Sequence, residues 1–385
     1  MAGAALFVGA ALVPLRIHRS DAATGSTGDA AKDAATASAL LPNLLDDVDD
    51  KISALETKMA ERPTDAKLHA QLGLTYLQKA RNEADPSTLP DAEEALRASL
   101  ELEGKDNLPG FVGMASLSNF RHDFSGSVKW SRKAIALNPY SASAYGLLGD
   151  ALFELGRVHA AEAAYQDMVD LRPDVASYVR ASYTLQYRGA TQAAIRAMRL
   201  AVQAAGPTGE SAAYVRHQLG DIYHAIRDYK ESERQNRIGT KLAPGFIPPT
   251  VGIAEAYVSQ GRLRDALRLV KHAAAELPNL EYTIKLGDLN RALGNDGAAQ
   301  RAYAAVAEKL GDYRRNGVNP DADFIVFYAD HGLWPQAALR EAFSIYENRP
   351  TGKIADSLGW MLHSVGRDRQ AMKYALEAIS APIAG

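Results

Sequence analysis

Residues 148–173, LGDALFELGRVHAAEAAYQDMVDLRP, contain two short helical patterns joined by a turn. On both sides of Gly156, apolar and small residues recur every three or four positions, which is the period of an amphipathic helix. Gly156 suits the turn because glycine adopts a left-handed backbone at little cost. Pro173 ends the second segment, since proline cannot continue a helix without losing a hydrogen bond. The stretch therefore predicts a helix–turn–helix hairpin.

The same pattern returns along the chain from Ala66 onward. An apolar residue followed by Gly or Ala begins several copies: Leu72-Gly73, Leu148-Gly149, Leu219-Gly220, Ile253-Ala254, Leu286-Gly287 and Leu358-Gly359. Residues expected to end helices fall at Pro63, Gly104, Pro139, Pro173, Gly206, Pro244, Pro278, Gly311 and Pro350. Most of these intervals are 33–35 residues long, and a longer one contains the insertion 82–89. Such a regular period indicates a repeat array.

The period and the order of residue types resemble the tetratricopeptide repeat, a helix–turn–helix unit of 34 residues. The resemblance covers about nine copies from Ala66 onward, with residues 44–61 as a preceding half unit. Residues 108–139 depart from the pattern, with Ala115 and Ser118 where Gly and Tyr are usual, and the copy at 324–346 is loose, with its turn at His331-Gly332. The resemblance implies an all-α, right-handed superhelix of about eighteen helices in nine antiparallel pairs, of a bacterial type.

Small residues in this pattern are expected to let the two helices of a unit approach closely. Gly149, Gly220 and Gly287 are the predicted contact points in the first helices. Matching small residues of the second helices are Ala161, Ala266, Ala299 and Ala371. Larger residues such as Tyr165 and Tyr303 are expected to fill the space between neighbouring units. Left-handed turns are predicted at Gly156, Gly261, Gly294 and Gly366, and core or inter-repeat packing for Trp130, Trp334 and Trp360.

The first 43 residues differ from this pattern. Residues 1–19 are an apolar run followed by Arg16, His18 and Arg19, and they predict a truncated signal or membrane anchor; the alternative is an alanine-rich tail without function. Residues 20–43 contain little to bury and predict a flexible linker. Residues 44–63 predict an amphipathic capping helix, and 64–385 the repeat array. We therefore expect the chain to be membrane-anchored or exported, with a cytoplasmic location as the alternative.

Composition excludes several chemistries. The chain of 385 residues has no cysteine, which rules out disulfides, thiolate catalysis and cysteine-ligated metals. Its net charge of −3 gives no general attraction to nucleic acid, so no nucleic-acid partner is expected. Phosphate-binding glycine loops, nucleophile elbows and paired-histidine zinc motifs are not found. The sequence thus predicts a non-enzymatic protein without a cofactor, although the regulatory subunit of an enzyme complex is an alternative.

One polar stripe is a candidate for a different function. His217, Asp221 and His224 are spaced by four and three residues on one predicted helix, so they share a face. Histidine and carboxylate side chains are common ligands of zinc or iron. The stripe supports a small-ligand or metal sensor as the alternative function, while the simpler interpretation is a polar face that lines the groove.

The leading interpretation is a protein-interaction scaffold that binds a peptide or protein segment in the concave groove of the superhelix. In four units the residue after the small Gly or Ala is acidic: Asp150, Asp221, Glu255 and Asp288. These carboxylates form a predicted ladder along the groove, with His217 and His224 beside Asp221, and would favour a basic partner. A structural role for the same side chains is the alternative.

Two further expectations concern partners. The Lys and Asn residues with which some tetratricopeptide co-chaperones bind a peptide carboxylate are missing; the corresponding residues are Ala70, Leu74, Val112, Ser116, Gly146 and Asp150. At the other end of the array, the last predicted helix carries Ala371, Tyr374, Ala375 and Ile379 near an open edge. Because repeat arrays normally finish with a polar cap, this edge predicts self-association or a chain cut short of its cap.

Overall fold

The computed structural model describes residues 48–333 and 335–380. Within these ranges the chain forms nineteen α-helices, one short 3-10 helix and no β-strand. The elements are α2 (Val48–Glu61), α3 (Ala66–Asn82), η1 (Pro86–Thr88), α4 (Leu89–Leu102), α5 (Leu108–Phe120), α6 (Phe124–Leu137), α7 (Ala142–Glu154), α8 (Val158–Leu171), α9 (Val175–Tyr187), α10 (Thr191–Ala204), α11 (Glu210–Ala225), α12 (Tyr229–Leu242), α13 (Pro248–Ser259), α14 (Leu263–Glu276), α15 (Leu280–Ala292), α16 (Asp296–Arg315), α17 (Ala322–His331), α18 (Pro335–Asn348), α19 (Gly352–Ser364) and α20 (Asp368–Ser380).

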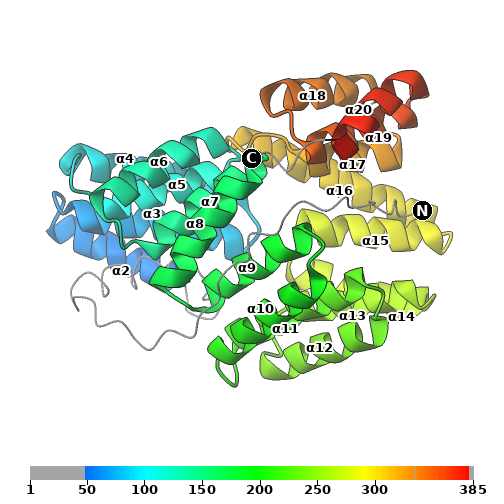
Figure 1. Cartoon of the computed structure of the whole chain (residues 1–385), viewed down its shortest axis with the longest axis horizontal. Coiled ribbons are helices and arrows are strands. Elements are labelled where there is room, and N and C mark those ends of the chain that lie inside the picture. Colours follow the sequence, from blue (N-terminus) through cyan, green and yellow to red (C-terminus); the bar gives the residue numbers. More distant parts are fainter. Residues whose placement is uncertain (1–47, 334, 381–385) are drawn as a thin grey trace.

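From Ala66 onward, eighteen helices pack as nine consecutive pairs, α3 with α4 through α19 with α20. In several places the first helix of one pair also packs on the first helix of a neighbouring pair, for example α5 on α7 and α11 on α13. Figure 1 shows the pairs following one another around a curve. No pair can bury its apolar face alone, so stacking creates a continuous core. The predicted all-α solenoid of helix pairs is confirmed.

Close contact within the pairs depends on glycine. Gly149, Gly220 and Gly287 are all buried. A Cβ atom at Gly149 would lie 2.3 Å from the Tyr165 ring, and one at Gly220 would lie 2.4 Å from the Asn236 amide nitrogen. At Gly287 the added atom would lie 2.4 Å from the Tyr303 ring. These approaches are too short for any larger residue without a shift, which confirms the predicted contact points.

The same distances add to one expectation. Tyr165 and Tyr303 also fill space within their own units, because each ring covers the glycine of the preceding helix. Tyr303 also reaches the next unit, where its ring centroid lies 6.2 Å from that of Phe327. The small residue at the contact and the large ring opposite it are therefore two halves of one packing arrangement.

Turns between the paired helices use the predicted glycines. Gly156, Gly261, Gly294 and Gly366 all have φ between +73° and +78°, a region that disfavours residues with a Cβ atom. Gly332 ends α17 with φ +65°. Gly311, in contrast, does not end a helix: α16 continues through it to Arg315, and the turn comes at Gly317.

The array closes on its own first units. The extended end of α16 and the segment after it lie against α3–α6, where Val318 is buried among Leu77, Leu89 and Leu117. The Tyr313 hydroxyl donates to the carbonyl oxygen of Ala84, 3.4 Å away, in the insertion 82–89. In Figure 1 this yellow-orange segment lies beside the cyan and green units. The insertion in the first unit and the extension of α16 thus meet each other.

A buried ion pair lies at the same junction. Arg349, in the connection between α18 and α19, pairs with Asp321, and their side chains are only 10% and 9% exposed. The Arg349 guanidinium also lies over the Phe124 ring, 4.6 Å from its centroid. We call Arg121, His122, Asn319, Asp321 and Arg349 the closing seam.

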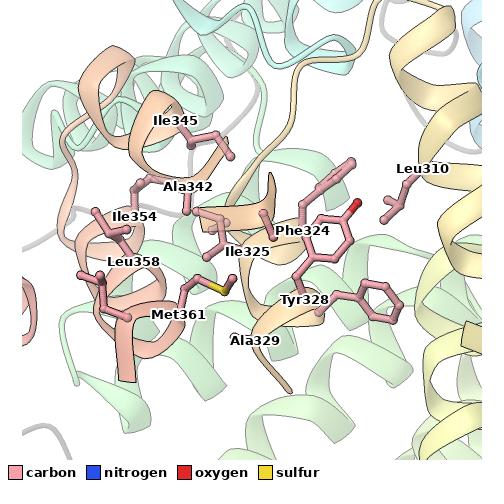
Figure 2. Packing of buried hydrophobic residues seen from close by; sticks show 14 of the residues in the cluster. Leu310, Phe324, Ile325, Tyr328, Ala329, Ala342, Ile345, Ile354, Leu358 and Met361 are labelled. Carbon is pink, nitrogen blue, oxygen red and sulfur yellow. The ribbon is translucent and has the colours of Figure 1, made fainter. Parts of the chain in front are cut away.

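The last two pairs share the largest apolar cluster. Figure 2 shows Phe324, Ile325 and Tyr328 of α17 between Leu310 of α16 and the helices α18 and α19. Ile354, Leu358 and Met361 of α19 complete it. Although the sequence pattern of this unit is loose, its core is dense.

The two tryptophans within the described residues differ in burial. Trp130 is partly buried against two clusters. Trp360 is not a core residue: it is 48% exposed, and its indole nitrogen donates to Asp330, 2.6 Å away. Trp334, the apolar run 1–19 and the linker 20–43 lie outside the described residues. The helix expected within 44–63 is described from Val48, and it packs against α3 through Val48 and Ile52.

Candidate functional site

We call the surface formed by the first helices of the pairs the inner face. Beside the closing seam, Nη1 of Arg349, between α18 and α19, lies 3.8 Å from Oε2 of Glu154 on α7. Burial would lower the pKa of Lys353 on α19, but the charges of Glu154, Asp323 and Asp321 raise it. Charged groups from opposite ends of the array therefore act on one another across this face.

A cavity of about 500 Å³ opens on the inner face between α7, α9 and α11. Polar lining groups include Asp150 and Glu154 of α7, Arg180 of α9 and Asp221 of α11. Phe153 and Tyr183 contribute aromatic surface to the same walls. This volume falls within the usual range for ligand sites.

Asp150 is held by an internal partner. Nε and Nη2 of Arg180 donate to its two carboxylate oxygens, each at 2.8 Å. The Tyr165 hydroxyl donates to the same carboxylate at 2.9 Å. Burial would lower the pKa of Arg180, but Asp150 raises it well above its ordinary value. This bidentate pair links α7 to α9 and leaves the Asp150 charge compensated.

Glu255 and Asp288 are compensated in a similar way. The Glu255 carboxylate lies 2.6 Å from Nζ of Lys285, so α13 is linked to α15. Asp288 accepts from Nε2 of His331 on α17 and from the Tyr303 hydroxyl, each at 2.8 Å. Burial would raise the pKa of Asp288, but these hydrogen bonds lower it. The three acids thus join successive first helices.

Asp221 differs from the other three predicted acids. Its contacts are weaker, with Nε2 of His217 at 3.5 Å and Nε2 of Gln218 at 3.5 Å. In the described part of the chain, no lysine or arginine lies within ion-pair distance of it. Burial, opposed by His217 and reinforced by Glu255, raises the pKa of Asp221 to about 6. Of the four acids, Asp221 is therefore the one whose carboxylate is least neutralised by neighbouring side chains.

Of the two histidines of the predicted stripe, His217 contacts Asp221 and His224 points to another partner. Nδ1 of His217 lies 2.9 Å from the Asn236 side-chain oxygen, and Nε2 of His224 lies 2.9 Å from the hydroxyl of Ser259, an exposed residue on α13. Among residues 48–333 and 335–380, no group of three or more His, Asp or Glu side chains is placed to hold a metal ion. The metal-sensor alternative therefore lacks a ligand set at this stripe.

The basic partners of the acids are functional residues that the sequence pattern did not single out. Arg180 and Lys285 each follow their acid by 30 positions, which is one repeat minus one helical turn. His331 follows Asp288 by 43 positions, because α16 is longer than the other second helices. A search for basic residues at this offset would have found the first two pairs.

Comparison with known families agrees with the helix pairs. Residues 142–175 match the tetratricopeptide repeat model, and they span α7, the turn at Gly156 and α8. Residues 142–175 therefore form a tetratricopeptide repeat. Two departures from the regular unit, the insertion 82–89 and the long α16, contact each other.

A plant protein shows sequence similarity over part of the repeat array. Anaphase-promoting complex subunit 7 of Arabidopsis thaliana is 23% identical over 180 residues, which are 46% of this chain and 31% of the plant protein. The chain thus matches about a third of that relative. Similarity over so limited a part leaves the activity of the whole relative as a matter for proposal.

Solved structures share the fold. Yeast Tom70 superposes with a TM-score of 0.53 at 16% identity, covering 78% of this chain and 66% of Tom70. The human IFIT1 dimer with m7Gppp-AAAA gives 0.52 at 14% identity, covering 86% and 76%. The hetero-tetramer Cut9–Hcn1 gives 0.51 at 17% identity, covering 62% and 46%. At these identities the likeness concerns the fold alone.

A helix that crosses a bilayer needs about 20 consecutive, predominantly apolar residues. None of the described helices combines the necessary length and apolar character.

Proposed function

We propose that this chain is a non-catalytic scaffold that holds a basic segment of a partner protein against the inner face. The observation that carries the proposal is the cavity between α7, α9 and α11, whose lining includes Asp221, a carboxylate without a lysine or arginine partner among the described residues. A concave surface with low-dielectric walls focuses such a charge and attracts cations. The names of the relatives support a role in assemblies: one is a subunit of a complex, and another was solved as a hetero-tetramer.

The other acids of the inner face set the position of the segment. Asp150, Glu255 and Asp288 are compensated within the chain, so they offer polar groups without much net charge. A bound segment would exchange hydrogen bonds with these pairs along several stacked units. Selectivity for a basic partner would then rest mainly on Asp221, while the paired acids keep the helices in register.

The hydroxyl of Ser259 lies beside the His224 imidazole, but this pair is not evidence for catalysis. The contact between Ser259 and His224 is exposed and lies outside the cavity lining. Catalytic groups normally work where water is excluded. The non-catalytic proposal therefore rests on the geometry of the inner face, and a regulatory subunit of an enzyme complex remains compatible with it.

Capture of partners by the whole tagged chain from its source cell, followed by mass spectrometry, tests the proposal. We expect a protein with a basic segment that the triple variant Asp221→Asn, Glu255→Gln, Asp288→Asn binds more weakly and with a flatter salt dependence. Circular dichroism checks that the variant folds, and Asp221→Asn alone serves as a second variant that breaks no strong pair. Unchanged binding and salt dependence in both folded variants would contradict the proposal.

A further inference from the structure

Resting on the proposed function, we propose that the cavity between α7, α9 and α11 receives a cationic side chain, an arginine or a lysine, from the partner segment. The inference rests on the cavity walls, because their charge, their aromatic rings and the exposure of Asp221 all favour a cationic ligand.

The lining side chains carry more negative than positive charge. Asp150, Glu154 and Asp221 contribute three carboxylates and Arg180 one guanidinium, while Arg349 and Lys353 also face Glu154 from the last pairs. Arg180 is engaged: two of its nitrogens donate to Asp150, and Nη1 donates to the carbonyl oxygen of Ala176, 3.2 Å away. An anionic ligand would find few free donors on it and would meet Asp221 and Glu154 instead.

Asp221 is the carboxylate best placed for a cation. Its side chain is 39% exposed, so a ligand can reach it. Glu255 on α13 and Glu281 on α15 raise the pKa of Asp221 by like-charge repulsion, whereas His217 and His224 on its own helix lower it. A partly buried carboxylate with like charges near it is stabilised when a cation arrives, because the cation offsets both repulsion and lost hydration. The pKa of Asp221 is raised to about 6 by this lost hydration and repulsion.

Aromatic rings supply the second element of the site. The centroid of Phe153 lies 5.1 Å from that of Tyr183 and 5.0 Å from that of Tyr187. Tyr183 lines the cavity and is 53% exposed, which is unusual for a ring in a packed cluster. The face of an aromatic ring attracts a guanidinium or ammonium group, and more strongly where water is excluded. Tyr183 therefore adds an accessible aromatic ring to the cavity that Asp221 lines.

Peptide probes that differ only in charge provide the test. Binding of acetyl-Gly-Gly-Arg-Gly-Gly-amide to the whole chain is compared with that of the same peptide containing citrulline, which keeps the shape but is neutral. A lysine peptide and its acetyl-lysine form make the second pair. By isothermal titration or NMR titration, we expect the cationic peptides to bind at least about tenfold more tightly than their neutral partners.

Matched variants locate the effect. Asp221→Asn and Tyr183→Leu should each remove most of the difference between the arginine and citrulline peptides. Asp356→Asn, at an exposed acid of α19, and Tyr140→Leu, at a ring 73% exposed in the turn before α7, are the controls and should leave it unchanged. Equal binding of the charged and neutral peptides would overturn the inference, as would an unchanged preference in folded Asp221→Asn.

The same variants separate this inference from the proposed function. If the chain captures a partner that Asp221→Asn and Tyr183→Leu bind normally, while Glu255→Gln with Asp288→Asn loses it, the scaffold function stands and the cavity inference fails. If none of these folded variants changes capture, the inner face is not the binding surface and both fail.

Discussion

Nδ1 of His122 lies 2.9 Å from the carbonyl oxygen of Asn319, a residue 197 positions later in the chain. The Asn319 amide in turn donates to the carbonyl oxygen of Arg121, 3.0 Å away. Such contacts are not expected of a simple repeat array, in which each unit touches only its neighbours. They tie the connection between α5 and α6 to the segment after α16, and so close the array on itself.

The closing seam should be a major source of stability. We expect Arg349→Ala to cost about 3–5 kcal/mol, because it leaves Asp321 buried without its partner. The radius of gyration, measured by small-angle X-ray scattering, should rise as the ends separate. Arg315→Ala is the control: its pair with Asp312 is exposed, and such pairs contribute only about 0–1 kcal/mol. Similar melting temperatures for the two variants would show that the seam does not hold the array closed.

Packing inside a unit can be tested at Gly220. Gly220→Leu should overpack its contact with Asn236 and cost roughly 1–3 kcal/mol or more, as seen in thermal or urea unfolding. Gly297→Ala in α16 is the matched control, since the nearest atom to its new Cβ would lie 3.7 Å away. That substitution should be neutral or slightly stabilising because alanine favours the helix. An unchanged stability of Gly220→Leu would mean that the helix pair is packed in a different register.

The pair between Asp288 and His331 should make stability depend on pH. The pKa of His331 is raised: burial would lower it, but Asp288 and the Phe327 carbonyl oxygen raise it. Its contribution is fully present below the ordinary histidine pKa and is lost as the pH rises through the higher folded value. The pKa of Asp288 is lowered, so its contribution is present above its ordinary value of about 4 and lost in acid.

The pH dependences of His331 and Asp288 together define the pH range in which their pair should stabilise the protein most. The melting temperature of the natural protein should exceed that of His331→Gln most at pH 5 to 6, and the difference should shrink above neutrality. A difference that is constant from pH 5 to 8.5 would show that His331 acts only through packing with Tyr303 and Phe327.

Asp221→Asn should stabilise the free protein at neutral pH. Burial raises the pKa of Asp221 to about 6, so the folded state binds a proton more readily than the unfolded state. The carboxylate therefore favours folding below its ordinary pKa and opposes it as the pH rises through about 6. The gain in melting temperature of the variant should be small at pH 4.5 and larger at pH 7.5. No change in this gain between the two pH values would contradict the assignment, whereas greater stability with weaker binding marks a functional group.

The last helix should mediate self-association. Met372, Leu376 and Ile379 follow one another at helical spacing on α20 and are 60%, 58% and 78% exposed. We expect concentration-dependent dimers in sedimentation velocity, and monomers for the double variant Leu376→Glu, Ile379→Glu. Lys373→Glu, which changes a neighbouring charge without altering the stripe, is the control. A natural protein that stays monomeric at high concentration would refute this expectation.

Local chemistry alone is enough to predict much of this molecule. The period of apolar residues determines where helices form, and the glycines at 156, 261, 294 and 366 determine where they turn. Gly149, Gly220 and Gly287 are predictable contact points, because a small residue that recurs within amphipathic helices normally marks the close approach of a second helix. The four acids of the inner face also follow from their repeat position, since residues equivalent in the repeat have equivalent surroundings.

The partners of these residues required the tertiary structure. Whether an acid is compensated depends on the side chain that the next first helix places opposite it: Arg180, Lys285 and His331 do so, and nothing comparable approaches Asp221 within the described chain. The closing seam depends on curvature, which accumulates from small rotations between all the pairs and cannot be read from any one of them. The sequence by itself therefore determined the repeating unit and its inner face. Only the folded array decided which of its charges remain free, because long-range charge pairing follows from the geometry of stacked units.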